Sequence, residues 1–275
     1  MCGFSSIILS KTRQKSAGGL AARQGFLTQS KAKFAEKTCA YACEDRFLRR
    51  FFMSSTVTYR YIKQNGDIHT YIKNADAAVE AQGYTEHSFA HVEKVASSVE
   101  MILTELGYDE RQVELGKIAA YLHDIGNVIN RVDHAQSGAV MAFRLLDKLN
   151  MPAEEICAII SAIGNHDEHT AQPLNAIAAA LIIADKTDVR RSRVRNFDYS
   201  DEFDIHDRVN YAVEESRLFF GSDKKVLNLE LKLDTNISSV MEYFEIFMDR
   251  MLLCKRSAEF FGISFRMRVN DTDVM

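Results

Sequence analysis

The sequence is short of residues that interrupt helices and of the long apolar runs that cross membranes. Among its 275 residues it has no tryptophan and only two prolines, Pro152 and Pro173. Long segments without proline favour a helical protein. No apolar run approaches the roughly 18 residues of a membrane span, and the net charge of −4 gives no general attraction to nucleic acid or anionic membranes. We therefore expect neither a membrane nor a nucleic-acid polymer as a partner.

Cysteine is also scarce, with five residues in the whole sequence. Cys39 and Cys43 are four residues apart, so they do not form the C-x-x-C pair of a thioredoxin-type redox site. Cys157 lies within an apolar helical pattern. We interpret the cysteines as free thiols in a reducing compartment, which predicts a cytoplasmic protein.

The first 35 residues contain no acidic side chain, although six lysines and arginines occur there. The apolar stretch FSSIIL is too short for the core of a signal peptide. One interpretation is a transit peptide, and the other is an extension from an early start codon, with the domain beginning near Met53. We predict a poorly ordered leader over 1–52, a helical metal-binding domain over 53–221 and a C-terminal unit over 222–275.

Helical periodicity dominates the middle of the chain. The apolar spacing predicts seven helices, at 69–83, 87–107, 110–124, 134–150, 152–166, 174–191 and 205–220. Asp109 suits an N-terminal cap, Pro152 suits a first turn and Gly107 suits a C-terminal stop. The segment 174–191 is apolar on nearly all sides, which predicts a central position.

The hydrophobic period changes to two near the C-terminus. Apolar residues alternate with polar ones over 226–234 and again over 263–270, which predicts two half-buried strands. Tight connections to a predicted helix at 238–262 make the two strands parallel, in a β-α-β unit. Because a two-stranded pair is marginal alone, we expect it to dock on the helical domain or to pair across a homodimer.

The stretch AAYLHDIGNVINRVDH, residues 119–134, has an imidazole and a carboxylate side by side at the end of an apolar helix. Such a pair is a weak indication by itself, because a histidine can simply be satisfied by its neighbour. Further histidines and carboxylates occur at buried edges or ends of predicted helices, where an unpaired charge is costly. The full set is His91, His123, Asp124, His134, His166 and Asp185. Histidine and carboxylate without cysteine suit divalent Fe, Mn, Co, Ni, Zn or Mg.

The order of these residues resembles a known family. With HxxxVA at His91 and HDIG at His123, residues 85–190 resemble the HD superfamily of metal-dependent phosphohydrolases, including the two extra histidines of its dinuclear-metal branch. The pattern HAQSGA, NH and ADKTD is similar to the bacterial HD hydrolases that cleave dinucleoside polyphosphates. HDIG and AD also resemble the cyclic-dinucleotide phosphodiesterases, but the GYP motif is missing and Asn127 stands where those enzymes carry lysine.

The resemblance implies a pair of metal ions. One ion would be held by His91, His123, Asp124 and Asp185, and Asp124 would bridge to a second ion completed by His134 and His166. The chemistry of the side chains agrees, because a carboxylate has two oxygens and can bridge two cations, whereas an imidazole cannot. Two ions, with Fe or Mn expected and Mg, Co, Ni or Zn as alternatives, would lower the pKa of a bridging water so that hydroxide attacks phosphorus at neutral pH. Asp124 and His123 are the predicted catalytic residues.

Polar residues close to the predicted ligands are candidates for binding the substrate. These are Asn127, Arg131, His169, Lys186 and Arg190. Arginine and lysine would bind phosphate through charge-assisted hydrogen bonds, although basic residues at a helix end are often simply solvated. Arg131 is a poor leaving-group acid because it hardly deprotonates, so that acid stays unassigned.

His87 lies four residues before His91 and on the same helical face. It would act as a substitute metal ligand, as a hydrogen-bonded neighbour of the ligands, or as an exposed histidine. The sequence leaves these alternatives open.

The pattern as a whole predicts a mainly α protein, an HD-type helical bundle with a small C-terminal β-α-β appendage. Its expected function is hydrolysis of a phosphoester or phosphoanhydride in a small phosphorylated molecule, with a nucleotide as the preferred class. A cyclic-dinucleotide phosphodiesterase and a non-catalytic, metal-containing regulatory module are the alternatives.

Overall fold

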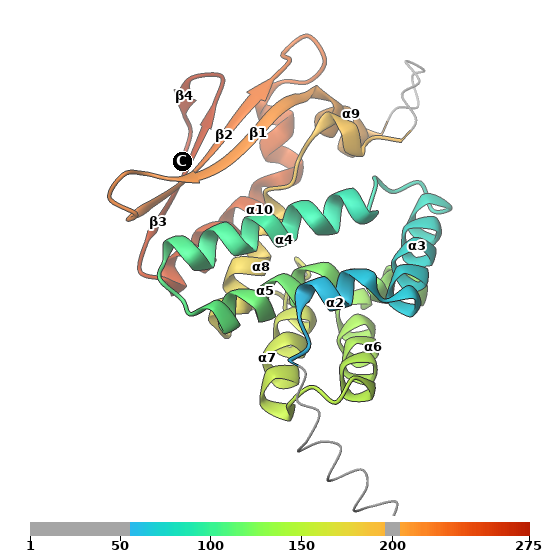
Figure 1. Ribbon diagram of the computed structural model, residues 1–275. Helices are drawn as coiled ribbons and strands as arrows, with labels where there is room; N and C mark the ends of the chain where they lie inside the picture. Colours follow the sequence, from blue (N-terminus) through green and yellow to red (C-terminus); the bar gives the residue numbers. More distant parts are fainter. Residues whose placement is uncertain (1–55, 196–203) are drawn as a thin grey trace, which may run out of the picture. The chain divides into compact units, whose positions relative to one another are not determined.

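The computed structural model describes residues 56–195 and 204–275, which belong to one compact unit, Thr56–Met275. Helices dominate the described part, and a small sheet lies toward the C-terminal end of the chain (Figure 1). The predicted fold class, a mainly helical domain with a small C-terminal appendage, is confirmed. The predicted leader, residues 1–52, lies outside the described residues.

Each of the six helices predicted between residues 69 and 191 is present, with ends that differ by a few residues. They are α3 (Gly66–Glu80), α4 (Phe89–Glu105), α5 (Glu110–Leu122), α6 (His134–Lys148), α7 (Ala153–Gly164) and α8 (Ala176–Lys186). Additions to the predicted set are α2 (Tyr59–Gln64) and the 3₁₀ turns η1 (Ile125–Val128) and η2 (Arg191–Arg193). Asp109 caps α5 as predicted, because its side chain accepts a 2.9 Å hydrogen bond from the backbone N–H of Gln112.

Helix α8 is central, as its apolar composition predicts. All of its residues except Ala176 and Asp185 are buried. It packs against α4, α5 and α7 of the helical domain and against α10 (Val240–Phe260) of the C-terminal unit. Full burial of each leucine or isoleucine contributes about 1.5–3 kcal/mol, so residues 181–183 anchor α8 firmly in the core. The last turn of α8, which carries Asp185, is therefore fixed at the edge of the core.

Residues 213–220 form a strand, so the predicted helix over 205–220 is wrong in its second half. Helix α9 (Ile205–Ala212) ends where β1 (Val213–Phe220) begins. Strand β1 pairs antiparallel with β2 (Val226–Leu233) along its length. Pairing with the next strand overrides the helical spacing of the apolar residues, because ladder hydrogen bonds and cross-strand contacts depend on a partner outside residues 213–220 themselves.

The C-terminal sheet has four strands in the order β1-β2-β3-β4. Strand β2 runs parallel to β3 (Ser264–Val269), and α10 connects them, which confirms the predicted β-α-β unit. Strand β1 and the short β4 (Thr272–Asp273) add antiparallel neighbours on either side, so the expected two-stranded pair is wrong. The alternating apolar residues of β2 and β3 are buried as predicted; they are Leu227, Leu229, Leu231, Leu233, Phe265, Met267 and Val269.

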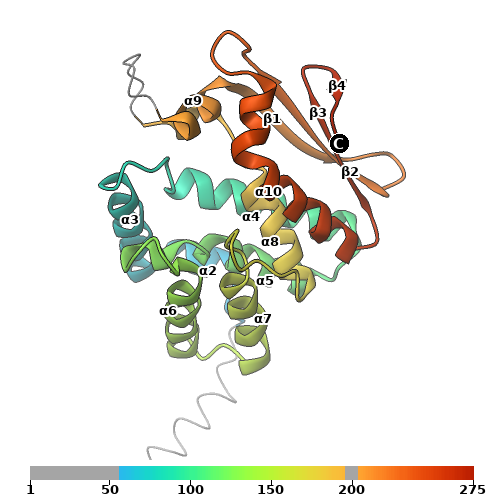
Figure 2. The ribbon, with the colours of Figure 1, turned by 180° about the vertical axis from the view of Figure 1, so that it is seen from behind.

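The C-terminal unit docks on the helical domain through α10, which packs against α8 (Figure 2). Docking is one of the two predicted ways to support the appendage, and a homodimer stays a prediction. In residues 56–195 and 204–275, none of the helices combines the length and the apolar character needed to cross a membrane. The docking of α10 brings the C-terminal unit next to the helix end that carries Asp185.

Candidate metal centre

The six predicted ligands come from separate elements and meet in one buried cluster. They are His91 in the first turn of α4, His123 and Asp124 between α5 and η1, His134 at the start of α6, His166 after α7, and Asp185 in the last turn of α8. Their side chains are at most 12% exposed. Packed helices bring first turns and helix ends to the same edge of the core, which is how residues far apart in sequence become neighbours.

The four histidines share one orientation, in which Nδ1 faces an oxygen acceptor. The acceptors are Asp188 Oδ2 for His91 (2.8 Å) and backbone carbonyl oxygens for the others, from Ala120 for His123 (2.7 Å), Arg131 for His134 (3.0 Å) and Ile163 for His166 (2.6 Å). Carbonyl and carboxylate oxygens only accept, so each Nδ1 carries a proton. In the neutral rings, the lone pairs are therefore on the Nε2 atoms, which all face the cluster.

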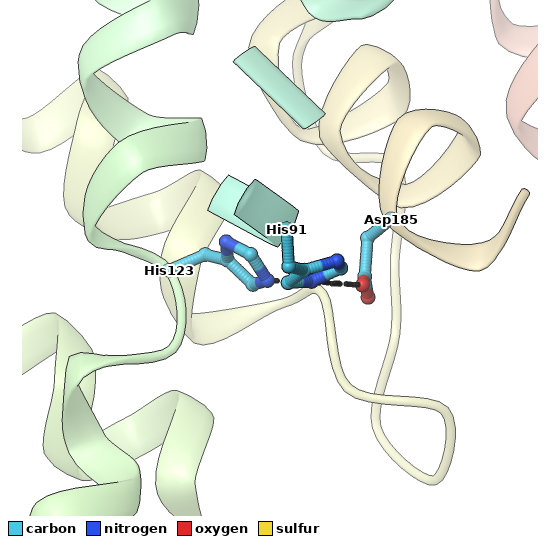
Figure 3. Close-up of side chains that lie close together, drawn as sticks. All are labelled: His91, His123 and Asp185. Atoms are coloured by element: carbon cyan, nitrogen blue, oxygen red, sulfur yellow. Dashed lines mark ion pairs between the residues drawn. The ribbon is translucent and has the colours of Figure 1, made fainter. Parts of the chain in front are cut away.

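The Nε2 atoms of His91, from α4, and of His123, from the turn after α5, both approach Asp185 (Figure 3). The distances to Asp185 Oδ1 are 3.3 Å from His91 and 3.7 Å from His123. The same Nε2 atoms lie 3.6 Å and 3.1 Å from Oδ2 of Asp124. All four contacts are close enough for ion pairs, but two are too long and two are not aligned for hydrogen bonds, so both Nε2 atoms are buried without a hydrogen-bond partner. Buried polar atoms are normally satisfied, and a shared cation would satisfy these.

The Nε2 atoms of His134 and His166 lie on the other side of Asp124. They are 3.4 Å and 3.9 Å from Oδ1 of that residue. They are also 3.2 Å from each other, where two lone pairs repel unless a proton or a cation lies between them. The two oxygens of Asp124 thus face two different pairs of histidines, which is the arrangement that a bridging carboxylate requires. The structure brings together all six predicted ligands, and their binding of metal stays a prediction.

Burial and charge act strongly on the protonation of the cluster. Burial lowers the pKa of His166 well below its usual value, and positive charge on His123 and Lys186 lowers it further. Burial alone would also lower the pKa of His123, but Asp124 and Asp185 outweigh burial and raise it to about 10. Without metal, a proton on His123 thus balances the carboxylates. A metal ion would take the place of that proton, because a ligand histidine must be neutral.

Two glycines explain how His134 comes so close to Asp124. A Cβ atom on Gly126 would lie 2.0 Å from the backbone oxygen of His134, and one on Gly138 would lie 3.2 Å from that of His123. Only glycine at position 126 lets α6 cross η1 at this distance. The glycine of the HDIG motif is therefore a packing residue that positions a ligand.

Asp188 is a site residue that the sequence reasoning missed. Its Oδ2 accepts the hydrogen bond from Nδ1 of His91, and its Oδ1 accepts one of 2.9 Å from Nε of Arg190. Burial would raise the pKa of Asp188, but His91 and Arg193 outweigh burial and lower it, so this carboxyl stays ionised. A carboxylate behind a ligand histidine fixes the orientation of the ring. Its position three residues after Asp185, in ADKTD, was the available signal.

The five predicted substrate-binding residues have different surroundings. Arg131 and Lys186 line a cavity of about 250 Å³ at the metal centre, together with His87. Asn127 donates to Oδ1 of Asp124 (3.0 Å) and so orients a ligand. Arg190 pairs with Asp188, and His169 lines a different depression. The cavity therefore contains only two of the five.

His87 is hydrogen-bonded next to the ligands. Its Nδ1 is 2.7 Å from the Thr85 carbonyl oxygen, and its ring centre is 5.6 Å from that of His91. Of the three alternatives left open by the sequence, these contacts match the hydrogen-bonded neighbour; ligation by His87 is untested.

The part of the helical fold that carries this cluster matches a known domain family. Residues 88–190 match the family model of the HD domain, and this matched segment includes all six candidate ligands. This assignment supports, in general terms, a metal-dependent phosphohydrolase. The resemblance to the HD superfamily inferred from the sequence is thereby confirmed at the level of the domain.

The individual proteins that match parts of this chain are 24% to 35% identical to it. An uncharacterised protein of Methanocaldococcus jannaschii is 24% identical over 215 residues, which are 70% of this chain and 82% of that protein. Ribonuclease Y of Lawsonia intracellularis is 35% identical over 104 residues, which are 37% of this chain but only 18% of the ribonuclease. The crystal structure of a predicted HD superfamily hydrolase from an uncultured Thermotogales bacterium is 25% identical, covering 45% of this chain and 67% of that one with a TM-score of 0.36.

Proposed function

We propose that this protein is a phosphohydrolase with two divalent metal ions, acting on a small phosphorylated molecule such as a nucleotide. The observation that carries the proposal is the convergence of four buried histidine Nε2 atoms on two carboxylates, with the two oxygens of Asp124 facing different histidine pairs. His91, His123 and Asp185 would hold one ion with Asp124. His134 and His166 would hold the other. Fe or Mn suits this donor set, and Mg, Co, Ni or Zn is the alternative.

When bound, the ions would supply an acidified water as nucleophile and positive charge for the oxygens of the reacting phosphoryl group. The protein would hold the ligands rigidly, through the carbonyl and carboxylate acceptors behind each Nδ1. Arg131 would bind the phosphoryl group. Its NH1 lies 3.5 Å from Nε2 of His134, and within the described residues no carboxylate pairs with it. Lys186, in contrast, already forms a 2.6 Å ion pair with Asp185, so it would position that ligand.

The size of the cavity favours a small substrate. The cavity that the described residues line at the metal centre has a volume of about 250 Å³, just below the roughly 300–1,000 Å³ of typical ligand pockets. A substrate of the size of a mononucleotide is therefore favoured over a cyclic dinucleotide. A substrate panel should still include a cyclic dinucleotide and a short single-stranded RNA, the latter because residues of this chain match part of ribonuclease Y.

The test is metal content combined with hydrolysis. Protein purified without added metal would be measured for ions per chain, then supplied with Mn or Fe and screened for release of orthophosphate or mononucleotides. Asp124→Ala should lose most of both ions and all hydrolysis while keeping its helical circular dichroism, because Asp124 contacts both histidine pairs. Asp249→Ala, an exposed carboxylate on α10, is the control and should leave both unchanged.

Two results would contradict the proposal. Full metal content in Asp124→Ala would exclude the bridging role. Metal binding without turnover of any substrate in the panel would favour the regulatory module instead.

A further inference from the structure

The cavity at the metal centre has a second wall, which comes from α9 and from α10 of the C-terminal unit. Phe247 and Arg250 of α10 and Asp207 and Asn210 of α9 line it, facing the residues of the HD domain. The HD family model ends at residue 190, so none of these side chains belongs to the matched domain. The docking of α10 on α8 therefore contributes to the shape and charge of the cavity.

Arg250 is held in place before any ligand binds. Its guanidinium lies over the ring of Phe247, 4.5 Å from the ring centre, and Glu168 pairs with its Nε. The Glu168 contact is an ion pair by distance but is not aligned as a hydrogen bond. The side chain is 26% exposed, and within the described residues the two terminal nitrogens of Arg250 have no hydrogen-bond partner. Stacking and pairing fix the group, while its outer donors stay available for an anion.

A second arginine in the same cavity has a similar arrangement but a different position. Arg131 lies over Tyr84, 5.5 Å from the ring centre, and its NH1 approaches His134 of the metal centre. Arg131 therefore lies where the reacting phosphoryl group would bind. Within the described residues, Arg250 forms neither a hydrogen bond nor an ion pair with a candidate ligand, and its ion-pair partner, Glu168, is two residues beyond His166. The two arginines thus provide separate anion-binding positions.

We propose that Arg250 binds a second anionic group of the substrate, so that the enzyme prefers a phosphoanhydride such as a nucleoside diphosphate to a simple phosphomonoester. This inference rests on the proposed phosphohydrolase function. It assigns the C-terminal unit a role in specificity, through a side chain that contacts the part of the substrate away from the metal ions. Arginine suits this role because its planar fork can donate two hydrogen bonds to a phosphate.

The test compares a diphosphate with a monophosphate of the same nucleoside. KM and kcat for ADP and AMP would be measured with metal-loaded wild type, Arg250→Met and Arg250→Lys. Losing a charged hydrogen-bonded pair should raise KM for ADP about 10-fold or more in Arg250→Met, with little change in kcat or in KM for AMP. Arg250→Lys keeps the charge without the fork and should fall between.

Arg256→Met is the matched control, because Arg256 is an exposed arginine on the same helix and does not line this cavity. It should match wild type with both nucleotides. Thermal melts of every variant check folding, and Arg250→Lys decides the question if Arg250→Met is unstable. An equal change in KM for AMP and ADP, or no change for either, would overturn the inference.

A failure of the proposed phosphohydrolase function can be distinguished from a failure of the inference about Arg250. If wild type hydrolyses neither nucleotide, binding of ADP and AMP to the metal-loaded protein would be measured by calorimetry. Tighter binding of ADP that disappears in Arg250→Met would support the second anion position even without turnover. Equal binding of ADP and AMP by wild type would overturn it.

Discussion

At the scale of single residues, the site is defined by the orientation of its four histidine rings, which the acceptors of their Nδ1 atoms hold in place. Backbone carbonyls from the ends of α5 and α7 and from the turn before α6 hold three of the rings, and only His91 relies on a side chain, Asp188. A carboxylate acceptor also makes the ring a more basic ligand than a carbonyl does. His91 is thus the ligand most sensitive to substitution of its neighbour.

Asp188→Asn should therefore weaken metal binding by about 10- to 100-fold. The amide can donate to Nδ1 as well as accept from it, so the proton of His91 is no longer fixed on Nδ1. Competition titration with a metal-binding dye would measure the affinity, and circular dichroism would check the fold. Asp249→Asn, exposed on α10, should have the affinity of wild type. An unchanged affinity in Asp188→Asn would mean that packing alone orients His91.

At the scale of elements, the crossing of α6 over η1 depends on the two glycines that separate their backbones. Gly126 faces the backbone oxygen of His134, and Gly138 faces that of His123. Backbone atoms cannot move aside as a flexible side chain can. The distance between His134 and Asp124 is therefore determined by the contact between two elements rather than by either element alone.

Gly126→Ala should consequently cost about 3 kcal/mol of unfolding free energy and separate His134 from the cluster. Gly138→Ala should cost less, because its Cβ would lie 3.2 Å from its nearest neighbour instead of 2.0 Å. Denaturant unfolding would give the stability, and ions per chain would report the site. Gly66→Ala is the control, since nothing lies within 4 Å of its added Cβ. Equal stability of the Gly66 and Gly126 variants would contradict this account of the crossing.

At the scale of the whole molecule, the buried histidines make folding of the metal-free protein depend on pH. Burial lowers the pKa of His87 and of His166 well below the usual 6.5. The unfolded chain takes up protons on these residues as pH falls through 6.5, whereas the folded protein does not. His123, whose pKa is raised to about 10, contributes stability that is constant below pH 6.5, falls as pH rises from 6.5 to 10 and is lost above about 10.

The free energy of unfolding of the metal-free protein should therefore fall as pH is lowered from 6.5 to 5. Each histidine that stays neutral contributes a slope of at most about 1.4 kcal/mol per pH unit. Denaturant unfolding in the presence of a chelator would measure it. His87→Gln should flatten the slope, and exposed His206→Gln should not. A slope of the opposite sign would show that these histidines are protonated in the folded state.

The sequence alone determined the elements with strong local signals and the identities of the six candidate ligands. Helical periodicity and Asp109 at a helix start are local properties, and the HD-type spacing is visible in the residues themselves. The sequence also predicted the parallel strands, since short connections to a helix leave little choice of direction.

Only the tertiary structure decided which residues meet. Strand β1 needs β2 beside it, Asp188 becomes a partner of His91 only when α4 and the end of α8 pack together, and Arg250 reaches the cavity only because α10 docks on α8. Arg190 looked like a phosphate ligand from its place after Asp185, yet it pairs with Asp188. Hydrogen bonds and ion pairs act over a few ångströms, so contacts between distant segments are determined by the packing of the chain rather than by local spacing.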